Sequence, residues 1–216
     1  MILGLTGGFG CGKSTAARLF AGRGLAHVDS DVLIREQVLP LDSVRRAIGA
    51  RHAQAVGADG QVDRVALARI VFTDDAERVW LEGLTHPLYF DLLRRALRSA
   101  PANDWVVEVP LLFEKSMENW FDFTACVACD RRSQIARLEQ RGLDPALAEQ
   151  RISKQLPLAR KIELSDFVLW NDGSAGFLKS QVDRIVDVMK DAKAAQISYT
   201  IPDVHSSQVR RRDASA

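Results

Sequence analysis

Gly7-Gly8-Phe9-Gly10-Cys11-Gly12-Lys13-Ser14, near the start of the chain, has the spacing G-x-x-x-x-G-K-[ST]. The apolar stretch Met1-Ile2-Leu3-Gly4-Leu5 precedes it, and such a run is typical of a buried strand. Thr15-Ala16-Ala17-Arg18-Leu19-Phe20-Ala21 follows, and its apolar spacing predicts a helix that ends near Gly22 and Gly24. A strand, a glycine-rich turn and a helix in this order aim backbone N–H groups and the positive end of a helix dipole at one point. We therefore expect a phosphate site at this turn.

This motif also assigns roles to single residues. Lys13 is expected to reach the β- and γ-phosphates of a nucleoside triphosphate, and the Ser14 hydroxyl to bind Mg²⁺. A chance glycine-rich turn is the alternative, and the correct strand and helix on either side argue against it. The expected nucleotide-binding residues are Gly8, Gly10, Cys11, Gly12, Lys13, Ser14 and Thr15.

Composition excludes several classes of protein. The 216 residues carry 29 Lys+Arg against 28 Asp+Glu, so no net charge draws the chain to nucleic acid or to a membrane. No apolar run reaches the roughly 20 residues that span a bilayer. The first apolar segment leads directly into the phosphate loop, which argues against a signal peptide. We expect a cytoplasmic protein that binds neither nucleic acid nor membrane.

Three cysteines are too few for a disulfide framework. Cys126-x-x-Cys129 suggests a metal or redox pair, but the surrounding residues read as a strand, on which positions three apart face opposite ways. No second Cys or His pair completes a zinc site, so this interpretation is rejected. Cys11 is expected to point its side chain outward. Its place near a helix N-terminus favours a lowered thiol pKa and sensitivity to oxidation.

Short apolar runs alternate with helical segments, and this pattern predicts an α/β fold with a five-stranded parallel sheet flanked by helices. The expected strands are residues 2–5, 26–28, 105–109, 123–128 and 167–170. Residues 33–100 read as helices, with Asp63 and either Asp74 or Asp75 as N-caps. A connection of this length predicts an inserted helical lobe that walls the site opposite the phosphate loop.

Residues 131–161 are expected to form a lid. They carry a mostly helical series of cations, namely Arg131, Arg132, Arg137, Arg141, Arg151, Lys154, Arg160 and Lys161. A solvated basic helix face is the alternative, but phosphoryl transfer needs cations over the γ-phosphate, and small kinases supply them with a closing lid. The nucleotide-binding core would then comprise residues 1–32, 101–130 and 162–196, and residues 197–216 would form a flexible tail.

Three further groups of residues narrow the chemistry. Asp29 and Asp31 end the second strand beside the phosphate loop, where one can cap the next helix and the other can accept a proton or order Mg²⁺. Glu108, in the apolar strand that Pro110 ends, is a second candidate for the magnesium shell. Thr85-His86-Pro87 lies inside the helical insertion, and a lone histidine there is more often structural than catalytic.

In this order the motifs resemble those of the dephospho-CoA kinase family. The resemblance rests on the phosphate loop from Leu5 to Thr15, Val28-Asp29-Ser30-Asp31, Ile34-Arg35-Glu36, Ala58-Asp59-Gly60-Gln61-Val62-Asp63-Arg64 with Ile70-Val71-Phe72, Leu84-Thr85-His86-Pro87-Leu88, Val109-Pro110-Leu111-Leu112-Phe113-Glu114, and Asp166-Phe167-Val168-Leu169-Trp170-Asn171-Asp172-Gly173. The phosphate loop alone is shared by many families, whereas the ordered series is specific. Two positions depart from the family pattern: Cys11 replaces a serine, and Gly142 follows Arg141 where the family usually has aspartate.

The resemblance implies a P-loop NTPase fold and an ATP-dependent phosphotransferase that acts on the ribose 3′-hydroxyl of dephospho-CoA, the last step of coenzyme A synthesis. ATP with Mg²⁺ and dephospho-CoA are the expected partners, and a monomer is the expected state. Asp31 would orient the hydroxyl and take its proton late, while Lys13, Arg137 and Arg141 would neutralise the transferring phosphoryl group. The expected acceptor-binding residues are Asp29, Asp31, His86, Pro110 and Leu111, and a turn at His86-Pro87 would help shape the acceptor pocket.

Two other functions remain open at this point. A nucleoside or nucleotide kinase of the same fold would share the loop, the strand-end acid and the lid. A nucleotide-binding regulator that has lost catalysis would need only the backbone amides, so the retention of Lys13, Ser14 and Asp31 speaks against it.

Overall fold

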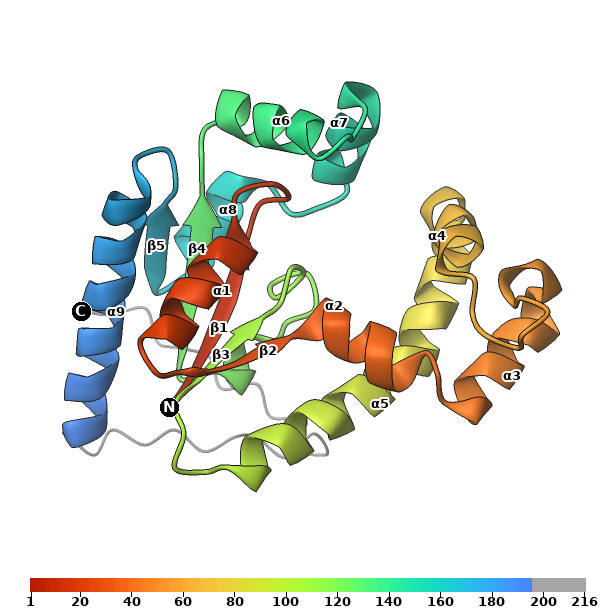
Figure 1. Ribbon diagram of the computed structural model, residues 1–216, viewed down its shortest axis with the longest axis horizontal. Helices are drawn as coiled ribbons and strands as arrows, with labels where there is room; N and C mark the ends of the chain where they lie inside the picture. Colours follow the sequence, from red (N-terminus) through yellow and green to blue (C-terminus); the bar gives the residue numbers. More distant parts are fainter. Residues whose placement is uncertain (196–216) are drawn as a thin grey trace.

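Five parallel strands form the centre of the fold (Figure 1). The computed structural model describes residues 1–195. The strands are β1 (Ile2–Gly7), β2 (Ala26–Asp29), β3 (Trp105–Glu108), β4 (Phe123–Ala128) and β5 (Phe167–Trp170), in the order β2-β3-β1-β4-β5. Each lies where the sequence predicts it, to within two residues at its ends, and the α/β fold is confirmed. The central strand β1 pairs with β3 on one side and β4 on the other, so the loop that follows β1 emerges in the middle of the sheet.

The phosphate loop joins β1 to helix α1 (Lys13–Gly22), which ends at the predicted Gly22. Gly10 and Gly12 have φ angles of 84° and 99°, in the left-handed region that favours glycine. A Cβ at Gly12 would also lie 2.3 Å from the side chain of Asn171. These two positions therefore require glycine for both conformation and space.

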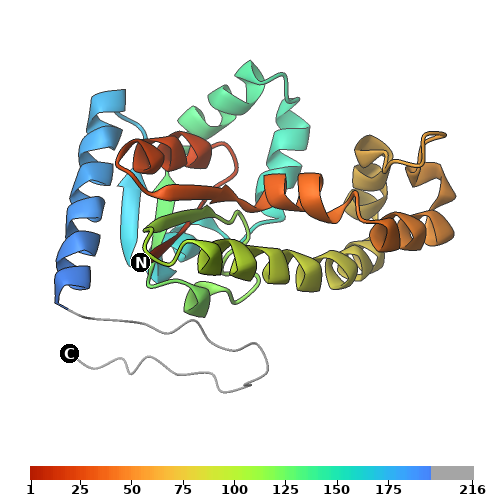
Figure 2. The ribbon, with the colours of Figure 1, turned by 60° about the horizontal axis from the view of Figure 1, so that its bottom comes forward.

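Helices cover the two faces of the sheet. On one face, α1 packs against α9 (Ala175–Ala194), and together with the strands they bury a core that includes Leu5, Phe20 and Val182. On the other face, α8 (Leu158–Leu164) contacts β1 and β4. Figure 2 shows α9 at one end of the molecule and the helices that follow β2 extending toward the other.

The chain between β2 and β3 is mostly helical. It forms α2 (Ser30–Leu33), a π-helical turn (Ile34–Val38), α3 (Asp42–Arg51), a 3-10 turn (Ala53–Ala55), α4 (Arg64–Thr73) and the long helix α5 (Asp75–Ser99). Asp63 caps α4 and Asp74 caps α5, as the sequence predicts. Leu93 and Leu97 of α5 belong to the same hydrophobic cluster as Val107 of β3. This cluster packs the C-terminal part of α5 against the sheet.

One expectation for this segment is wrong. His86 and Pro87 do not form a turn, because α5 runs through them without interruption. Proline lacks the N–H that would bond the carbonyl one turn earlier, so helices usually end or kink near it. Thr85, which is buried, donates its hydroxyl to the carbonyl of Leu81 at 2.8 Å within the same helical turn. Packing of α5 against its neighbours thus overrides the local signal of the proline.

Residues 131–161 comprise α6 (Arg131–Gln140), α7 (Pro145–Ser153) and the first half of α8. Figure 1 shows α6 and α7 beyond the carboxyl ends of the strands, on the same side as the phosphate loop. Lys161 is fully buried on α8 and contacts Glu114 at 2.9 Å and the carbonyl of Pro110 at 2.8 Å. It therefore anchors α8 to the loop after β3, unlike the exposed cations earlier in the run.

The expected tail, residues 197–216, lies outside the described residues. Among the helices of residues 1–195, none combines the length and apolar character that crossing a lipid bilayer requires. A 3-10 turn (Glu118–Trp120) between β3 and β4 completes the described elements.

Candidate active site

A cavity of about 630 Å³ lies at the carboxyl ends of β1, β2 and β3. Three parts of the chain line it: the phosphate loop with the neighbouring strand ends, the junction of α4 and α5, and the helices after β4. The lining residues are Phe9, Gly10, Gly12, Lys13, Ser14, Asp29, Asp31, Phe72, Asp75, Arg78, Glu108, Pro110, Leu111, Arg141, Arg151, Lys154 and Gln155. Open parallel sheets bind their ligands at this edge, so the cavity is the candidate site.

Side chains of α6 and of the residue after β5 hold the phosphate loop in place. Gln134 of α6 donates to the carbonyl of Phe9 at 2.6 Å, and Asn171 donates to the carbonyl of Cys11 at 2.8 Å. Arg137 donates to the carbonyls of Asn171 at 2.5 Å and Cys11 at 3.5 Å. The structure thus places Arg137 behind the loop and does not bring it to the cavity lining, where we expected it over the transferring phosphate.

Lys13 begins α1 and faces the cavity. Its ammonium group donates to the carbonyls of Gly7 at 3.2 Å and Gly8 at 3.1 Å. Burial lowers the pKa of Lys13, and the positive charge of Lys161 adds to this effect. Glu108 and Asp31 act on this charge from a distance, but Lys13 forms no ion pair with a carboxylate of residues 1–195. A phosphate anion would supply a direct countercharge, which suits Lys13 to bind the phosphates of a nucleotide.

Ser14 and Glu108 meet at the floor of the cavity. The Ser14 hydroxyl donates to Oε1 of Glu108 at 2.9 Å. Oε2 of Glu108 is buried and accepts no hydrogen bond within residues 1–195, with Nε2 of His27 at 3.8 Å. Burial raises the pKa of Glu108, while the bond from Ser14 acts in the opposite direction. A buried carboxylate oxygen without a partner is a position where a cation would be stabilised.

The two aspartates at the end of β2 have different tasks. Asp29 caps α2 and accepts the N–H groups of Asp31 at 2.9 Å and Val32 at 3.1 Å. Asp31 faces the cavity, through which solvent reaches it. The surrounding protein nevertheless desolvates its carboxyl group, and this burial, with the charge of Asp29, raises the pKa of Asp31. Because Asp29 supplies the cap, the carboxylate of Asp31 is available for chemistry.

The expected acceptor residues are only partly brought together. Pro110 and Leu111 line the cavity beside Asp29 and Asp31. His86 does not belong to the lining; its half-buried ring packs 5.8 Å from that of Phe90. Burial lowers the pKa of His86, and the charge of Lys115 adds to this. The contacts of His86 are thus those of a packed residue of α5.

Three cations in the segment that contains α6 and α7 face the cavity and form no ion pair with a carboxylate of residues 1–195: Arg141, Arg151 and Lys154. Other cations of the same run are paired, Arg131 with Glu149 and Arg160 with Glu163. Sequence reasoning selected Arg141 and missed Arg151 and Lys154 as site residues. Their spacing of three, which places both on one helix face, was the available signal.

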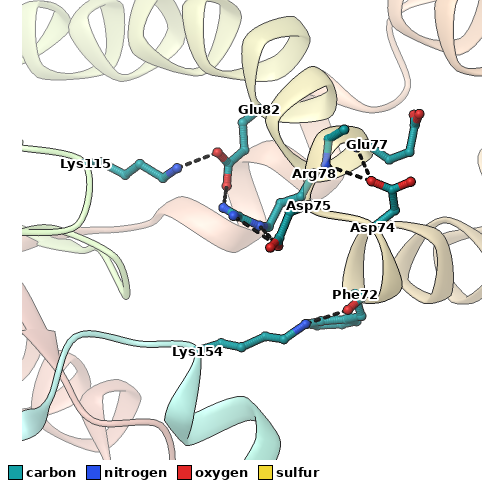
Figure 3. Close-up of polar contacts among 9 residues, drawn as sticks. Phe72, Asp74, Asp75, Glu77, Arg78, Glu82, Lys115 and Lys154 are labelled. Atoms are coloured by element: carbon teal, nitrogen blue, oxygen red, sulfur yellow. Dashed lines mark hydrogen bonds and ion pairs between the residues drawn. The ribbon is translucent and has the colours of Figure 1, made fainter.

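Arg151 connects the two walls of the cavity. Its guanidinium group lies 5.0 Å from the ring centre of Phe72, at the end of α4, and 5.7 Å from that of Phe9 in the phosphate loop. Its Nε is buried and without a hydrogen-bond partner in the described chain. Figure 3 shows Lys154 donating to the carbonyl of Phe72, at 2.5 Å. An arginine held by its faces keeps the N–H groups at its edge free for an anion.

Arg78 of α5 is the other cation of this wall, and carboxylates surround it. It contacts Asp75 and Glu82 at 3.3 Å each, and Glu82 also binds Lys115 at 2.5 Å (Figure 3). These contacts fix Arg78 at the mouth of the cavity and offset much of its charge. Among residues 1–195, the unpaired positive charge of the site therefore lies on Lys13 and on the segment that contains α6 and α7.

The remaining loop residues Gly8, Cys11 and Thr15 do not line the large cavity. Gly8 faces a smaller cavity behind the loop, and the N–H of Thr15 donates to the carbonyl of Gly12 at 3.0 Å.

The expectation that the Cys11 side chain packs outward is wrong, because Cys11 is fully buried. Its sulfur lies 3.2 Å from that of Cys129. Cys126 and Cys129 form no metal site: within residues 1–195, no three His, Cys, Asp or Glu side chains gather as ligands.

Comparison with known proteins gives consistent matches. A family model described as dephospho-CoA kinase matches residues 1–176. The dephospho-CoA kinase of Gloeobacter violaceus is 39% identical over 188 residues, which cover 86% of this chain and 91% of that protein. The dephospho-CoA kinase of Sodalis glossinidius is 40% identical over 207 residues, 95% of this chain and 98% of that protein.

Two solved structures are similar in fold. A crystal structure from Thermus thermophilus superposes with a TM-score of 0.77 at 31% identity and covers 92% of this chain and 98% of that chain. The dephospho-CoA kinase from Campylobacter jejuni gives a TM-score of 0.66 at 19% identity, over 89% of this chain and 98% of that chain. At that identity the second likeness shows the fold alone.

Proposed function

The chain belongs to the dephospho-CoA kinase family, and on this premise we propose that it transfers the γ-phosphoryl group of ATP to the ribose 3′-hydroxyl of dephospho-CoA. The observation that carries the proposal is that Lys13, Ser14 and Asp31 line one and the same cavity. A coupled assay of ADP release tests it, with dephospho-CoA compared with adenosine, nucleoside monophosphates and pantothenate. Dephospho-CoA should be the preferred acceptor by a wide margin.

We assign the two substrates to opposite walls of the cavity. ATP would lie on the N–H groups of the phosphate loop, where the helix dipole of α1 favours an anion. Dephospho-CoA would lie between residues 33–100 and the sheet edge, against Pro110 and Leu111. Residues 131–161 would form the lid over both, and residues 1–32, 101–130 and 162–196 the nucleotide-binding core. The closeness of Phe9 and Phe72 to one arginine supports a site shared by these parts.

Asp31 is the residue that we propose to act on the acceptor. Its carboxylate would hold the 3′-hydroxyl in line with the γ-phosphorus and receive the proton as the new P–O bond forms. In phosphoryl transfer the transition state is loose, so positioning and charge neutralisation contribute more than early removal of the proton. Lys13 would stay on the transferring oxygens throughout the step, where negative charge shifts toward the leaving ADP.

The residues at the floor of the cavity fit a magnesium ion. The Ser14 hydroxyl and the free oxygen of Glu108 are oxygen ligands of the kind that Mg²⁺ takes. The lack of a larger ligand cluster in residues 1–195 agrees with a metal held mainly by water and substrate phosphates. Such an ion, when bound, neutralises charge on the β- and γ-phosphates.

Glu108→Gln should increase the Mg²⁺ concentration for half-maximal activity about tenfold, because the carboxylate that supports the ion loses its charge. Since burial raises the pKa of Glu108, the Mg²⁺ requirement of the wild type should also grow as the pH falls through this raised pKa and the carboxylate takes up a proton. Titration of activity with Mg²⁺ at several pH values measures both effects. A Glu108→Gln variant with an unchanged Mg²⁺ requirement would remove Glu108 from the metal shell.

We propose that Arg141, Arg151 and Lys154 are the lid cations over the phosphoryl group. Arg151→Ala should lower kcat/KM about 10- to 100-fold, because one charge that stabilises the transition state is lost. Arg160→Ala is the matched control: Arg160 is exposed, pairs with Glu163 and does not belong to the cavity lining. Equal losses in the two variants, or none in either, would contradict the assignment.

The two rival functions predict other results in the same assay. A nucleotide kinase would release ADP faster with a nucleoside monophosphate than with dephospho-CoA. A regulator without catalysis would bind ATP and release no ADP with any acceptor. The family match over residues 1–176 favours neither rival.

A further inference from the structure

Two cysteines from distant parts of the chain meet beneath the phosphate loop. Cys11 lies in the loop itself, and Cys129 follows the last residue of β4. Both are free and buried, and their sulfur atoms lie 3.2 Å apart, with the Cys129 thiol donating to Cys11. Cys126, the third cysteine, is buried within β4 and has no such contact among the described hydrogen bonds. The two cysteines in contact are therefore Cys11 and Cys129, and not the Cys126 and Cys129 of the sequence motif.

The pair contains one reactive thiol. The hydrogen bond from Cys129 lowers the pKa of Cys11 to about 7, against the effect of burial and with help from the charge of Lys13. The same contact and burial raise the pKa of Cys129. At neutral pH, Cys11 therefore holds the greater share of thiolate and is the nucleophile, with a neutral thiol beside it.

A small oxidant can approach the pair from behind the loop. A second cavity, of about 240 Å³, is lined by Gly8 and Cys129 together with Gln134 and Leu158. Cys11 does not line it, but its sulfur lies 3.2 Å from that of Cys129, which does. Gln155 borders both this cavity and the one that Lys13 and Asp31 line. A water molecule occupies roughly 30 Å³ in the liquid. The cavity is several times larger, so a hydrogen peroxide molecule fits into it.

We propose that Cys11 and Cys129 form a reversible disulfide that switches off the ATP site. In the first step, the thiolate of Cys11 attacks one oxygen of hydrogen peroxide; the O–O bond breaks, and the leaving hydroxide takes a proton to become water. In the second step, the sulfur of Cys129 attacks the sulfenic acid of Cys11 and releases the second water. Two thiols and one peroxide thus give one disulfide and two waters. A dithiol reductant reverses the reaction by exchange.

The disulfide would displace the loop that holds ATP, so this inference rests on the proposed function of that loop. A disulfide bond is about 2.05 Å long, so the sulfurs must approach by roughly 1.2 Å. Hydrogen bonds hold the loop on both sides of the Cys11 sulfur: the N–H of Cys11 donates to the carbonyl of Gly8 at 3.1 Å, and Asn171 donates to the carbonyl of Cys11 at 2.8 Å. Misplacement of catalytic groups by about 1 Å can cost on the order of 100-fold in rate. Because the same loop N–H groups would bind the phosphates of ATP, their displacement should also weaken ATP binding, by roughly tenfold or more.

The test uses the full chain and one equivalent of hydrogen peroxide. Peptide mass spectrometry should find Cys11 joined to Cys129, and calorimetric titration with ATP should show the weaker binding in the cross-linked fraction. Dithiothreitol should restore the original affinity. This test measures ATP binding directly and does not depend on the acceptor. The disulfide proposal can therefore hold even if dephospho-CoA proves not to be the acceptor, and it can fail even if dephospho-CoA is the acceptor.

Two variants make the test specific. Cys129→Ala should bind ATP as the reduced wild type does and keep that affinity after the same treatment, since no cross-link can form. Cys126→Ala is the matched control and should remain as sensitive as the wild type. The proposal is overturned if no Cys11–Cys129 peptide appears, if the cross-linked protein binds ATP with unchanged affinity, or if Cys129→Ala loses as much affinity as the wild type.

Discussion

Lys13→Ala is expected to lower kcat at least about 100-fold, as the removal of a charge stabiliser from an enclosed site does. Lys13 lies in the cavity with its pKa lowered by burial and by Lys161. The bound triphosphate would therefore gain strongly from this one charge, and the gain should be largest when charge moves toward the leaving ADP. Steady-state kinetics with saturating ATP and dephospho-CoA measures the effect.

The same substitution should leave folding almost unchanged. It removes two hydrogen bonds, to the backbone carbonyls of Gly7 and Gly8, and no ion pair with a carboxylate of residues 1–195. A thermal unfolding midpoint close to that of the wild type would show that the loss belongs to the site. If Lys13→Ala keeps near-native turnover, the assignment of the loop to the transferring phosphates fails.

Asp31→Asn is expected to lower kcat by about 100-fold or more, the usual size of a lost acid–base contribution. ATP affinity should change only a few-fold, because the carboxylate acts on the acceptor and not on the donor. Stability should hold as well, since Asp29 and not Asp31 caps α2. Asp29→Asn serves as the contrast: it removes charge at the same strand end without removing the proposed base.

The pH dependence gives a second test of Asp31. Burial and the charge of Asp29 raise its pKa above the ordinary value for aspartate. A base with a raised pKa is active above that pKa and loses activity as the pH falls through it. The acidic limb of the kcat profile should therefore lie above the ordinary aspartate value of about 3.9, and Asp31→Asn should abolish this limb. A variant that loses only stability, with kcat intact, would reduce Asp31 to a structural residue.

The sequence predicts best what is encoded by neighbours in the chain. The strands, the caps Asp63 and Asp74 and the loop that begins α1 each depend on a run of residues with one period or one conformational need. The floor of the site could be expected for the same reason. Ser14 follows the loop after β1, Glu108 ends the neighbouring parallel strand β3, and the structure joins the two side chains at 2.9 Å.

What the sequence could not predict depends on contacts between distant residues. Arg137 and Arg151 look alike in a basic run, yet one bonds the carbonyl of Asn171 and the other lies between two aromatic rings. Pro87 signals a turn locally, but the packing of α5 keeps the helix continuous. The partner of Cys11 lies 118 positions along the chain, and no local pattern connects the two.

The position of the new phosphate on the product tests the central claim most directly. The protein is incubated with ATP, Mg²⁺ and dephospho-CoA, and the product is analysed by phosphorus and proton NMR. We predict one product, phosphorylated at the ribose 3′ oxygen, with one ADP released for each molecule formed. The 3′-deoxy analogue should bind without reacting. A 2′-phosphorylated product, or faster turnover of a nucleoside monophosphate than of dephospho-CoA, would contradict the assignment even if ATP binds as described.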